Sequence, residues 1–77
     1  DKKEYKKALT YLLKALEIDK NIENIHLYLS VNYYMLKQED KTIFHLQQAI
    51  DKNLLSLQLF LDFCPDGKHL TESLKIK

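Results

Sequence analysis

Two stretches of this chain repeat each other at a constant offset in residue number. The stretch that begins at Glu4 and the stretch that begins at Gln38 match at the following pairs: Lys7/Lys41, Ala8/Thr42, Leu9/Ile43, Leu12/Leu46, Ala15/Ala49, Leu16/Ile50 and Glu17/Asp51. We call this spacing, which joins Lys7 to Lys41, the repeat offset. A fixed period of this kind marks a protein in which one supersecondary unit stacks on the next. The chain is therefore expected to be built from stacked units.

The periodicity of apolar residues predicts that these units are helical. Apolar residues recur at three- and four-residue steps through both copies, which places them on one helix face. The predicted helices span 2–19, 22–36, 40–52, 54–64 and 68–75. The segment 22–36 is apolar on more than one side, so we expect it to lie between neighbours.

Several polar or helix-breaking residues predict where these helices begin and end. Asn21 and Asn53 are candidate N-caps for the helices that follow them. The polar strip 37–40 suits a tight connection between antiparallel helices. Pro65-Asp66-Gly67 is the strongest stop in the chain.

The composition agrees with an all-α domain. The chain has 77 residues, is 45% hydrophobic and holds one Gly and one Pro. It is too apolar for disorder and too poor in turn residues for a many-stranded β protein. We predict a single domain over 1–77, with about four helices in antiparallel pairs and a short C-terminal cap.

The repeat resembles the tetratricopeptide repeat family. The segment Tyr5-x-x-Ala8-x-x-x-Leu12-x-x-Ala15-Leu16-x-Ile18-Asp19 is close to the second-helix pattern of that family, and His26, Leu29, Ser30 and Tyr33 take its first-helix positions. The resemblance implies a right-handed superhelix, in which 1–20 is the second helix of one repeat, 21–53 a helix pair and 54–77 a capping segment. Lys20 stands where the family prefers Pro, and Thr42 where it prefers Ala. Beyond Asn53, two registers remain possible: the repeat offset, and the shorter offset that joins Asp19-Lys20-Asn21 to Asp51-Lys52-Asn53.

The resemblance implies a scaffold that holds a partner peptide or helix in a concave groove. By resemblance, the groove-facing residues are Asn24, Leu27, Val31 and Tyr34, whose spacing places them on one helix face. The apolar Leu27 and Val31 favour an apolar ligand over an acidic tail. The same four residues could equally pack on a neighbouring helix, and the sequence leaves both interpretations open.

The first helix raises the question of self-association. By resemblance it lacks the helix that should precede it, which would leave Leu9, Leu12 and Leu16 partly bare. We therefore expect either a longer array that continues N-terminally or a homo-oligomer formed through this face. An alternative function follows, in which the segment is a dimerisation or regulatory module of a larger enzyme or sensor.

The residues capable of chemistry are scattered along the chain. His26 falls at a packing position, His45 on the polar side of its helix, and His69 near the end. A structural zinc site needs four ligands, and Cys64 with His69 supplies two. Cys64 sits in an apolar run, where a thiol is normally inert. We expect no catalytic residue, metal or cofactor, and hence no enzyme.

The charge balance argues against nucleic acid as a partner. The formal net charge is +1 and all twelve basic residues are Lys, whereas nucleic-acid readers usually combine a basic excess with Arg contacts. The apolar run Leu54–Cys64 is interrupted by polar residues and is too short for a membrane span. The lone Cys64 favours the cytoplasm, and the composition, rich in Lys, Asn and Ile, is suggestive of a bacterial protein.

Overall fold

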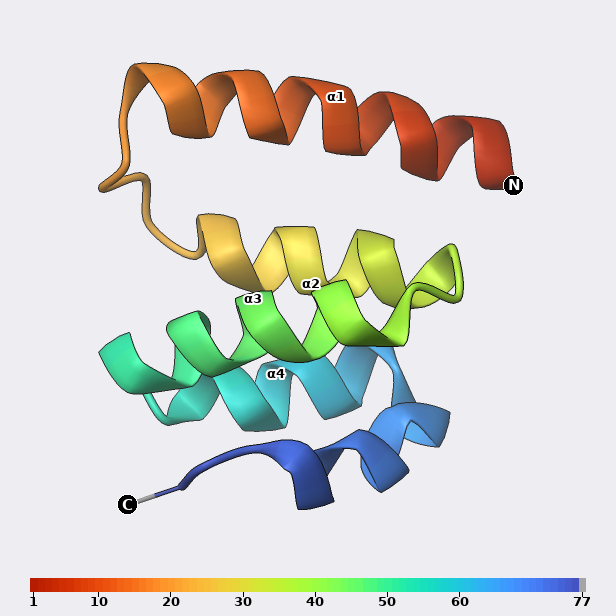
Figure 1. The fold of residues 1–77 in the computed structure, drawn as a ribbon, viewed down its shortest axis with the longest axis vertical. Coiled ribbons are helices and arrows are strands. Elements are labelled where there is room, and N and C mark those ends of the chain that lie inside the picture. Colours follow the sequence, from red (N-terminus) through yellow and green to blue (C-terminus); the bar gives the residue numbers. More distant parts are fainter. Residues whose placement is uncertain (77) are drawn as a thin grey trace.

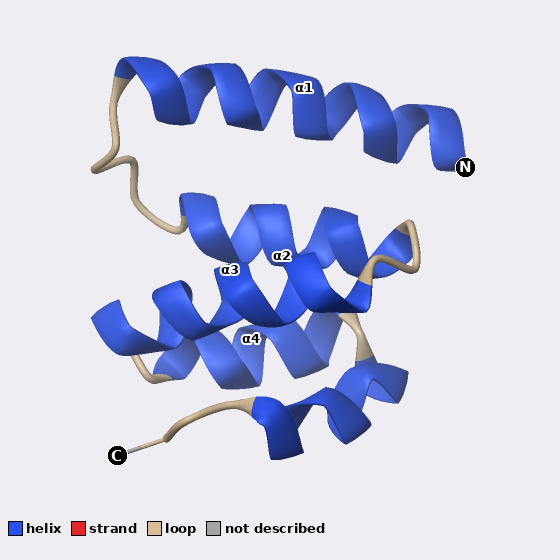
Figure 2. Ribbon diagram, in the orientation of Figure 1, coloured by secondary structure: helices blue, strands red, loops and turns tan. Residues whose placement is uncertain are grey.

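The computed structural model describes residues 1–76 and is all-α, as the sequence predicts. Four α-helices are followed by one 3-10 helix: α1 (Lys2–Ile18), α2 (Ile25–Met35), α3 (Glu39–Lys52), α4 (Leu55–Phe63) and η1 (Pro65–Ser73). Figure 2 shows helices joined by short loops, and residues 1–76 contain no strand.

The helices stack in chain order. Consecutive helices α1 to α4 alternate in direction, so α2 and α4 run parallel to each other (Figure 1). Helix α2 contacts α1, α3 and α4, whereas α3 contacts α2, α4 and η1. The two ends of the stack are α1 and η1 (Figure 1). This arrangement gives α2 neighbours on three sides.

The start of α2 corrects one prediction. Asn21 does not cap this helix, because the helix begins only at Ile25. The backbone N–H of Asn21 donates to Asp19 Oδ1 at 2.8 Å, and this local bond holds the chain in an Asx turn before the helix. The cap position is Asn24, which has a left-handed backbone (φ 63°) and no side-chain capping bond.

The repeat is preserved in α1 and α3 up to their last residue. Asp19 and Asn53 end the two helices with extended backbones, and their N–H groups donate to the carbonyls of Ala15 and Ala49. Beyond this point the repeat offset fails, because it pairs buried Leu29 with exposed Phe63. The shorter offset, which joins Asp19-Lys20-Asn21 to Asp51-Lys52-Asn53, fails as well, because it pairs buried Leu27 with exposed Leu59.

A shorter loop explains this loss of register. Asn53 Oδ1 accepts the N–H of Leu55 at 3.0 Å, so α4 begins almost directly after α3. Buried residues of α2 and α4 match instead in the pairs Ile25/Ser56, Leu29/Phe60 and Tyr33/Cys64, which share one spacing that we call the loop-shortened register. Helices α2 and α4 therefore bury equivalent sides. The offset between them is three residues shorter than the repeat offset, because the loop before α4 is shorter.

The core consists of two clusters that share α2. One cluster joins α1 to α2 and contains Leu9, Ile25, Leu29 and Tyr33. The other joins α2, α3, α4 and η1 and contains Leu27, Leu46, Ala49, Ile50, Phe60, Cys64 and Leu70. Helix α2 contributes buried residues to both, which confirms that it lies between neighbours.

Two small polar side chains inside the core satisfy their own hydrogen bonds. Thr42, at a position where the repeat otherwise carries Ala, is fully buried and donates to the carbonyl of Gln38 at 2.9 Å. Ser30 donates to the carbonyl of Leu27. Because buried hydroxyls are costly only when they lack a partner, both residues are tolerated where helices approach closely.

The C-terminal segment covers the end of α4. The helix stops at Phe63 before the predicted Pro65-Asp66-Gly67 break, but the last helix is a 3-10 helix over Pro65–Ser73 rather than 68–75. A Cβ at Gly67 would lie 3.0 Å from the Phe60 ring, so glycine permits this close approach. The Gln47 amide then binds the backbone of Lys75 through two hydrogen bonds of 2.7 and 3.0 Å.

Candidate functional site

Three of the four residues predicted to line a groove pack in or against the core cluster that joins α2, α3, α4 and η1. Leu27 is only 1% exposed and belongs to the core, so it offers no surface to a partner. Val31 and Tyr34 are half-buried and pack on the same cluster, with the Tyr34 ring edge-on to Phe60. Asn24 is exposed at the start of α2. The packing interpretation therefore accounts for Leu27, Val31 and Tyr34.

The face predicted to drive self-association is also covered. Leu9 is buried, and Leu12 and Leu16 are half-buried against α2, where they join Ile25 and Leu29. Helix α2 itself packs against the Leu9–Leu12–Leu16 face, although Leu12 and Leu16 stay partly exposed. Self-association through this face stays a prediction. The residues of α1 that remain open lie on other sides of the helix.

A different apolar face is exposed, on α4. Leu55, Leu59 and Phe63 recur every four residues, which places them along one side of the helix. Their exposed fractions lie between 41% and 68%. Single exposed apolar residues are ordinary, but three in line on one short helix form a continuous stripe.

Helix α2 presents the equivalent face. The loop-shortened register pairs Leu55, Leu59 and Phe63 with Asn24, Tyr28 and Asn32, and Tyr28 is itself 44% exposed. Since α2 and α4 run parallel in direct contact and bury equivalent sides, their open sides are equivalent too (Figure 1). We call this surface, formed by Tyr28, Leu55, Leu59 and Phe63, the α2–α4 face. It carries no charged side chain.

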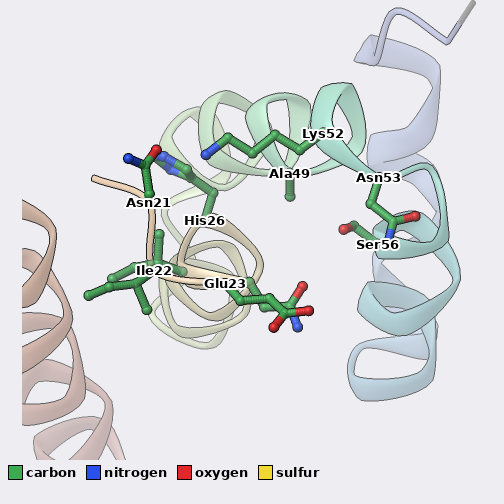
Figure 3. A pocket seen from close by; sticks show the side chains of 10 residues that line it. Asn21, Ile22, Glu23, His26, Ala49, Lys52, Asn53 and Ser56 are labelled. Carbon is green, nitrogen blue, oxygen red and sulfur yellow. The ribbon is translucent and has the colours of Figure 1, made fainter. Parts of the chain in front are cut away.

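A pocket lies in the middle of the stack, where the loops before α2 and α4 meet the end of α3. It has a volume of about 240 Å³. Its lining comprises Asn21, Ile22, Glu23, Asn24, Ile25, His26, Ala49, Lys52, Asn53 and Ser56. In Figure 3 the Lys52 side chain extends toward His26 and Asn21, whereas Ser56 faces the pocket from α4. A carboxylate, an ammonium group and amides thus share one small cavity, which gives it no single electrostatic preference.

A pair of histidines joins α2 to α3 beside this pocket. The Nδ1 atoms of His26 and His45 lie 3.0 Å apart, and the His45 ring stacks on Tyr33 with a centroid distance of 5.4 Å. Burial, aided by the nearby His26, lowers the pKa of His45 to about 4. Burial, and then the Lys52 charge, lowers the pKa of His26. Both rings are therefore neutral at pH 7 and can share one proton in an N–H···N bond.

This pair corrects the prediction that His45 lies on the polar side of its helix, since it is only 9% exposed. A signal in the sequence was available for part of this contact. In an antiparallel hairpin, residues at similar distances from the connection face each other, and Tyr33 and His45 flank the connection 37–40 in this way. His26 lies much further from the connection, so spacing does not predict its contact with His45. The contact between the two histidines was therefore not predicted from the sequence.

The other candidate groups have ordinary structural roles. Cys64 is a buried free thiol, and burial raises its pKa to about 11. His69 Nε2 lies 3.0 Å from a Glu39 carboxylate oxygen, and this hydrogen bond raises the pKa of His69. Within residues 1–76 no three His, Cys, Asp or Glu side chains are grouped so that they could hold a metal ion.

Comparison with known protein families, curated proteins and solved structures finds no match to this chain. The likeness to tetratricopeptide repeats therefore stays a prediction from the sequence. Among the described residues, no helix combines the length and apolar character that a membrane crossing requires.

Proposed function

We propose that this chain is a protein-interaction scaffold of the tetratricopeptide type, which binds an apolar peptide or helix of a partner on the α2–α4 face. The observation that carries the proposal is the exposed stripe Leu55, Leu59 and Phe63 on α4, with the exposed Tyr28 at the equivalent position of the contacting helix α2. An amphipathic helix is commonly recognised through anchors placed every three or four residues. The spacing on α4 matches such a partner.

The chemistry of the face indicates what kind of partner fits. Large apolar and aromatic side chains contribute most of the energy of protein interfaces, particularly when polar residues surround them. Asn24 and Asn32 flank Tyr28 on α2, and Gln58 and Asp62 lie beside the stripe on α4. An apolar partner segment with a polar margin suits this surface better than a strongly charged one. The proposed role is binding without catalysis.

A peptide library selected on the immobilised chain tests the proposal. Peptides from the selection should bind the unmodified chain, and Leu59→Arg should weaken them at least about tenfold, since truncating or charging an interface anchor costs about 1.4 kcal/mol or more. Leu13→Arg is the matched control, because Leu13 is a comparably exposed leucine on α1. Circular dichroism should show the same helix content for all three chains.

The proposal fails if the selected peptides bind Leu59→Arg as tightly as they bind the unmodified chain. Light scattering tests the alternative of a dimerisation module. A dimer that is lost in Leu59→Arg would make the α2–α4 face a contact between two copies of the chain, instead of a surface for another protein.

A further inference from the structure

The pocket in the middle of the stack lies where α2 and α4 differ. In the loop-shortened register, Ser56 of α4 stands where α2 carries Ile25, and both residues are buried. A serine fills much less space than an isoleucine, and the small Ala49 of α3 lines the pocket as well. These two small side chains leave room for the cavity of about 240 Å³.

The hydroxyl of Ser56 is a polar group that opens into this cavity. Ser56 is only 3% exposed, and its hydroxyl forms no hydrogen bond within residues 1–76. No fully enclosed polar side-chain atom among these residues lacks a partner, so the Ser56 oxygen reaches the open space of the pocket (Figure 3). The buried Ser30 differs, because it donates to the carbonyl of Leu27. Since buried hydroxyls normally have a partner, Ser56 is placed to bind a ligand.

Two opposite charges line the same pocket without forming an ion pair. Glu23 lies just before α2 and Lys52 ends α3, and their side chains stand on different walls (Figure 3). The ion pair found within residues 1–76 is the one between His69 and Glu39. A simple anion in the pocket would meet the Glu23 carboxylate, and a simple cation would meet the Lys52 ammonium group. A ligand that carries both charges complements both walls.

The ends of two helices add partial charges of both signs. Helix α2 begins at the pocket and α3 ends there, so the positive end of one helix dipole lies beside the negative end of the other. Asn24, at the cap position of α2, forms no side-chain capping bond, and the N–H of His26 has no acceptor among the described residues. A free N–H at a helix start is a donor for a carboxylate.

We infer that this pocket is a binding site for a small zwitterion of the amino acid type, a molecule with one carboxylate and one ammonium group. The carboxylate binds the Lys52 ammonium group, which extends toward His26 and the start of α2 (Figure 3). The ammonium group of the ligand donates to the Glu23 carboxylate and to the Ser56 hydroxyl. The cavity is smaller than the roughly 300–1,000 Å³ of sites for drug-sized molecules, so a ligand of amino acid size fits it.

This inference does not depend on the proposed function. The residues that line the pocket include none of the four that form the α2–α4 face. A partner peptide on that face and a zwitterion in the pocket are separate ligands, and either can be absent without affecting the other.

NMR titration of the full chain with a series of zwitterions tests the site. Glycine, β-alanine and γ-aminobutyrate separate the two charges by an increasing number of carbon atoms. At least one of them should give saturable shifts of the His26 and Ser56 amides at millimolar concentration. The acid and the amine of the same chain length carry one charge each. Both should bind at least about tenfold more weakly, because each loses hydrogen bonds between charged groups.

Variants of the chain assign the two charges to their walls. Glu23→Gln and Lys52→Gln should each weaken the best zwitterion about tenfold, and Ser56→Ala should weaken it about threefold or more. Glu72→Gln and Lys68→Gln are the matched controls, because both residues are exposed and lie outside the pocket. The controls should bind as the unmodified chain does, and circular dichroism should show the same helix content for all the chains.

Three results would overturn the inference. The first is that no zwitterion of the series gives saturable shifts. The second is that the matching acid or amine binds as tightly as the zwitterion, which would make the pocket a site for a single charge. The third is that Glu23→Gln and Lys52→Gln bind as tightly as the two control variants do. Because Glu23 and Lys52 are exposed, their variants keep the test valid even if Ser56→Ala disturbs the fold.

Discussion

Helices α1 and α3 carry the same repeat segment, yet they lie in different surroundings. Leu46 of α3 is fully buried between α2 and α4, whereas its equivalent Leu12 of α1 is half-buried against α2 alone. The two helices end in the same way, at Asp19 and Asn53. A repeat residue is therefore buried according to the number of its neighbours, and its position within the repeat does not decide this.

The largest expected effect compares the two equivalent leucines. Leu46→Ala should cost about 3–5 kcal/mol of unfolding free energy, because it leaves a cavity in the centre of the core. Leu12→Ala should cost about 1–2 kcal/mol, because the site is partly open to water. Urea denaturation followed by circular dichroism measures both values. Equal losses would show that α1 is as tightly held as α3.

The next effect is the dependence of the unfolding free energy on pH through the pair His26 and His45. Helix α1 has no equivalent of this pair, because Tyr11 stands at the position of His45. The folded pKa of His45, about 4, lies below the ordinary value of 6.5. The unfolded chain therefore takes up a proton first, and stability should fall as pH falls from about 6.5 to about 4. The expected loss from this group is about 2–3 kcal/mol, since each pH unit contributes up to about 1.4 kcal/mol per proton.

Denaturation midpoints measured across this pH range check the prediction. His45→Tyr installs the residue that α1 carries at the equivalent position, and it should flatten the pH dependence. His69→Gln is the control, because His69 is exposed and its pKa is raised by Glu39 rather than lowered. A His45→Tyr chain with the same pH profile as the unmodified chain would exclude His45 as the cause.

A smaller difference is expected for the two alanines of the repeat. Ala49 is buried where α3 meets α2, so Ala49→Leu should overpack the contact at a cost of about 1–3 kcal/mol. Ala15 is half-buried and packs against the cluster between α1 and α2, so Ala15→Leu should cost less than Ala49→Leu. Thermal melts of the two variants test this order. The reverse order would mean that the surroundings of Ala15 are tighter than those of Ala49.

The smallest effect compares the two ends of the repeated helices. Asn53 Oδ1 accepts the N–H that begins α4, so Asn53→Ala should cost about 0.5–1 kcal/mol. Asp19 Oδ1 accepts a loop N–H, and Asp19→Ala should cost a few tenths of a kcal/mol. Asn53→Ala should make the α4 amides exchange their hydrogens faster, whereas Asp19→Ala should leave this exchange unchanged. Faster exchange in α4 after Asp19→Ala would contradict this assignment.

The helices themselves were predictable, because apolar spacing and helix-breaking residues act locally. The segment 40–52 was correct to one residue, and Pro65-Asp66-Gly67 lies just beyond the end of α4. The start of α2 was wrong by three residues, since the bond between Asp19 and Asn21 competes with the helix and spacing does not reveal it.

The candidate site was less predictable. Leu27 was assigned to a groove by resemblance, with packing on a neighbouring helix as an equal alternative, because periodicity does not state which neighbour each side of α2 meets. The stripe Leu55, Leu59 and Phe63 was missed because two registers remained possible beyond Asn53. Neither register is correct, because the loop between α3 and α4 is shorter than the loop between α1 and α2.

Spacing along the chain was enough to specify the helical class, the repeat that joins Lys7 to Lys41, and the residues of each helix that are apolar, because these features depend on one helix at a time. Packing between helices established that His26 meets His45, that α2 covers Leu9 and Leu16, and that Tyr28 and Leu59 stay open. The reason is that a side chain is buried only when two surfaces are in contact. The sequence of one helix specifies one of these surfaces, whereas the other belongs to a loop or a neighbouring helix whose position depends on the whole fold.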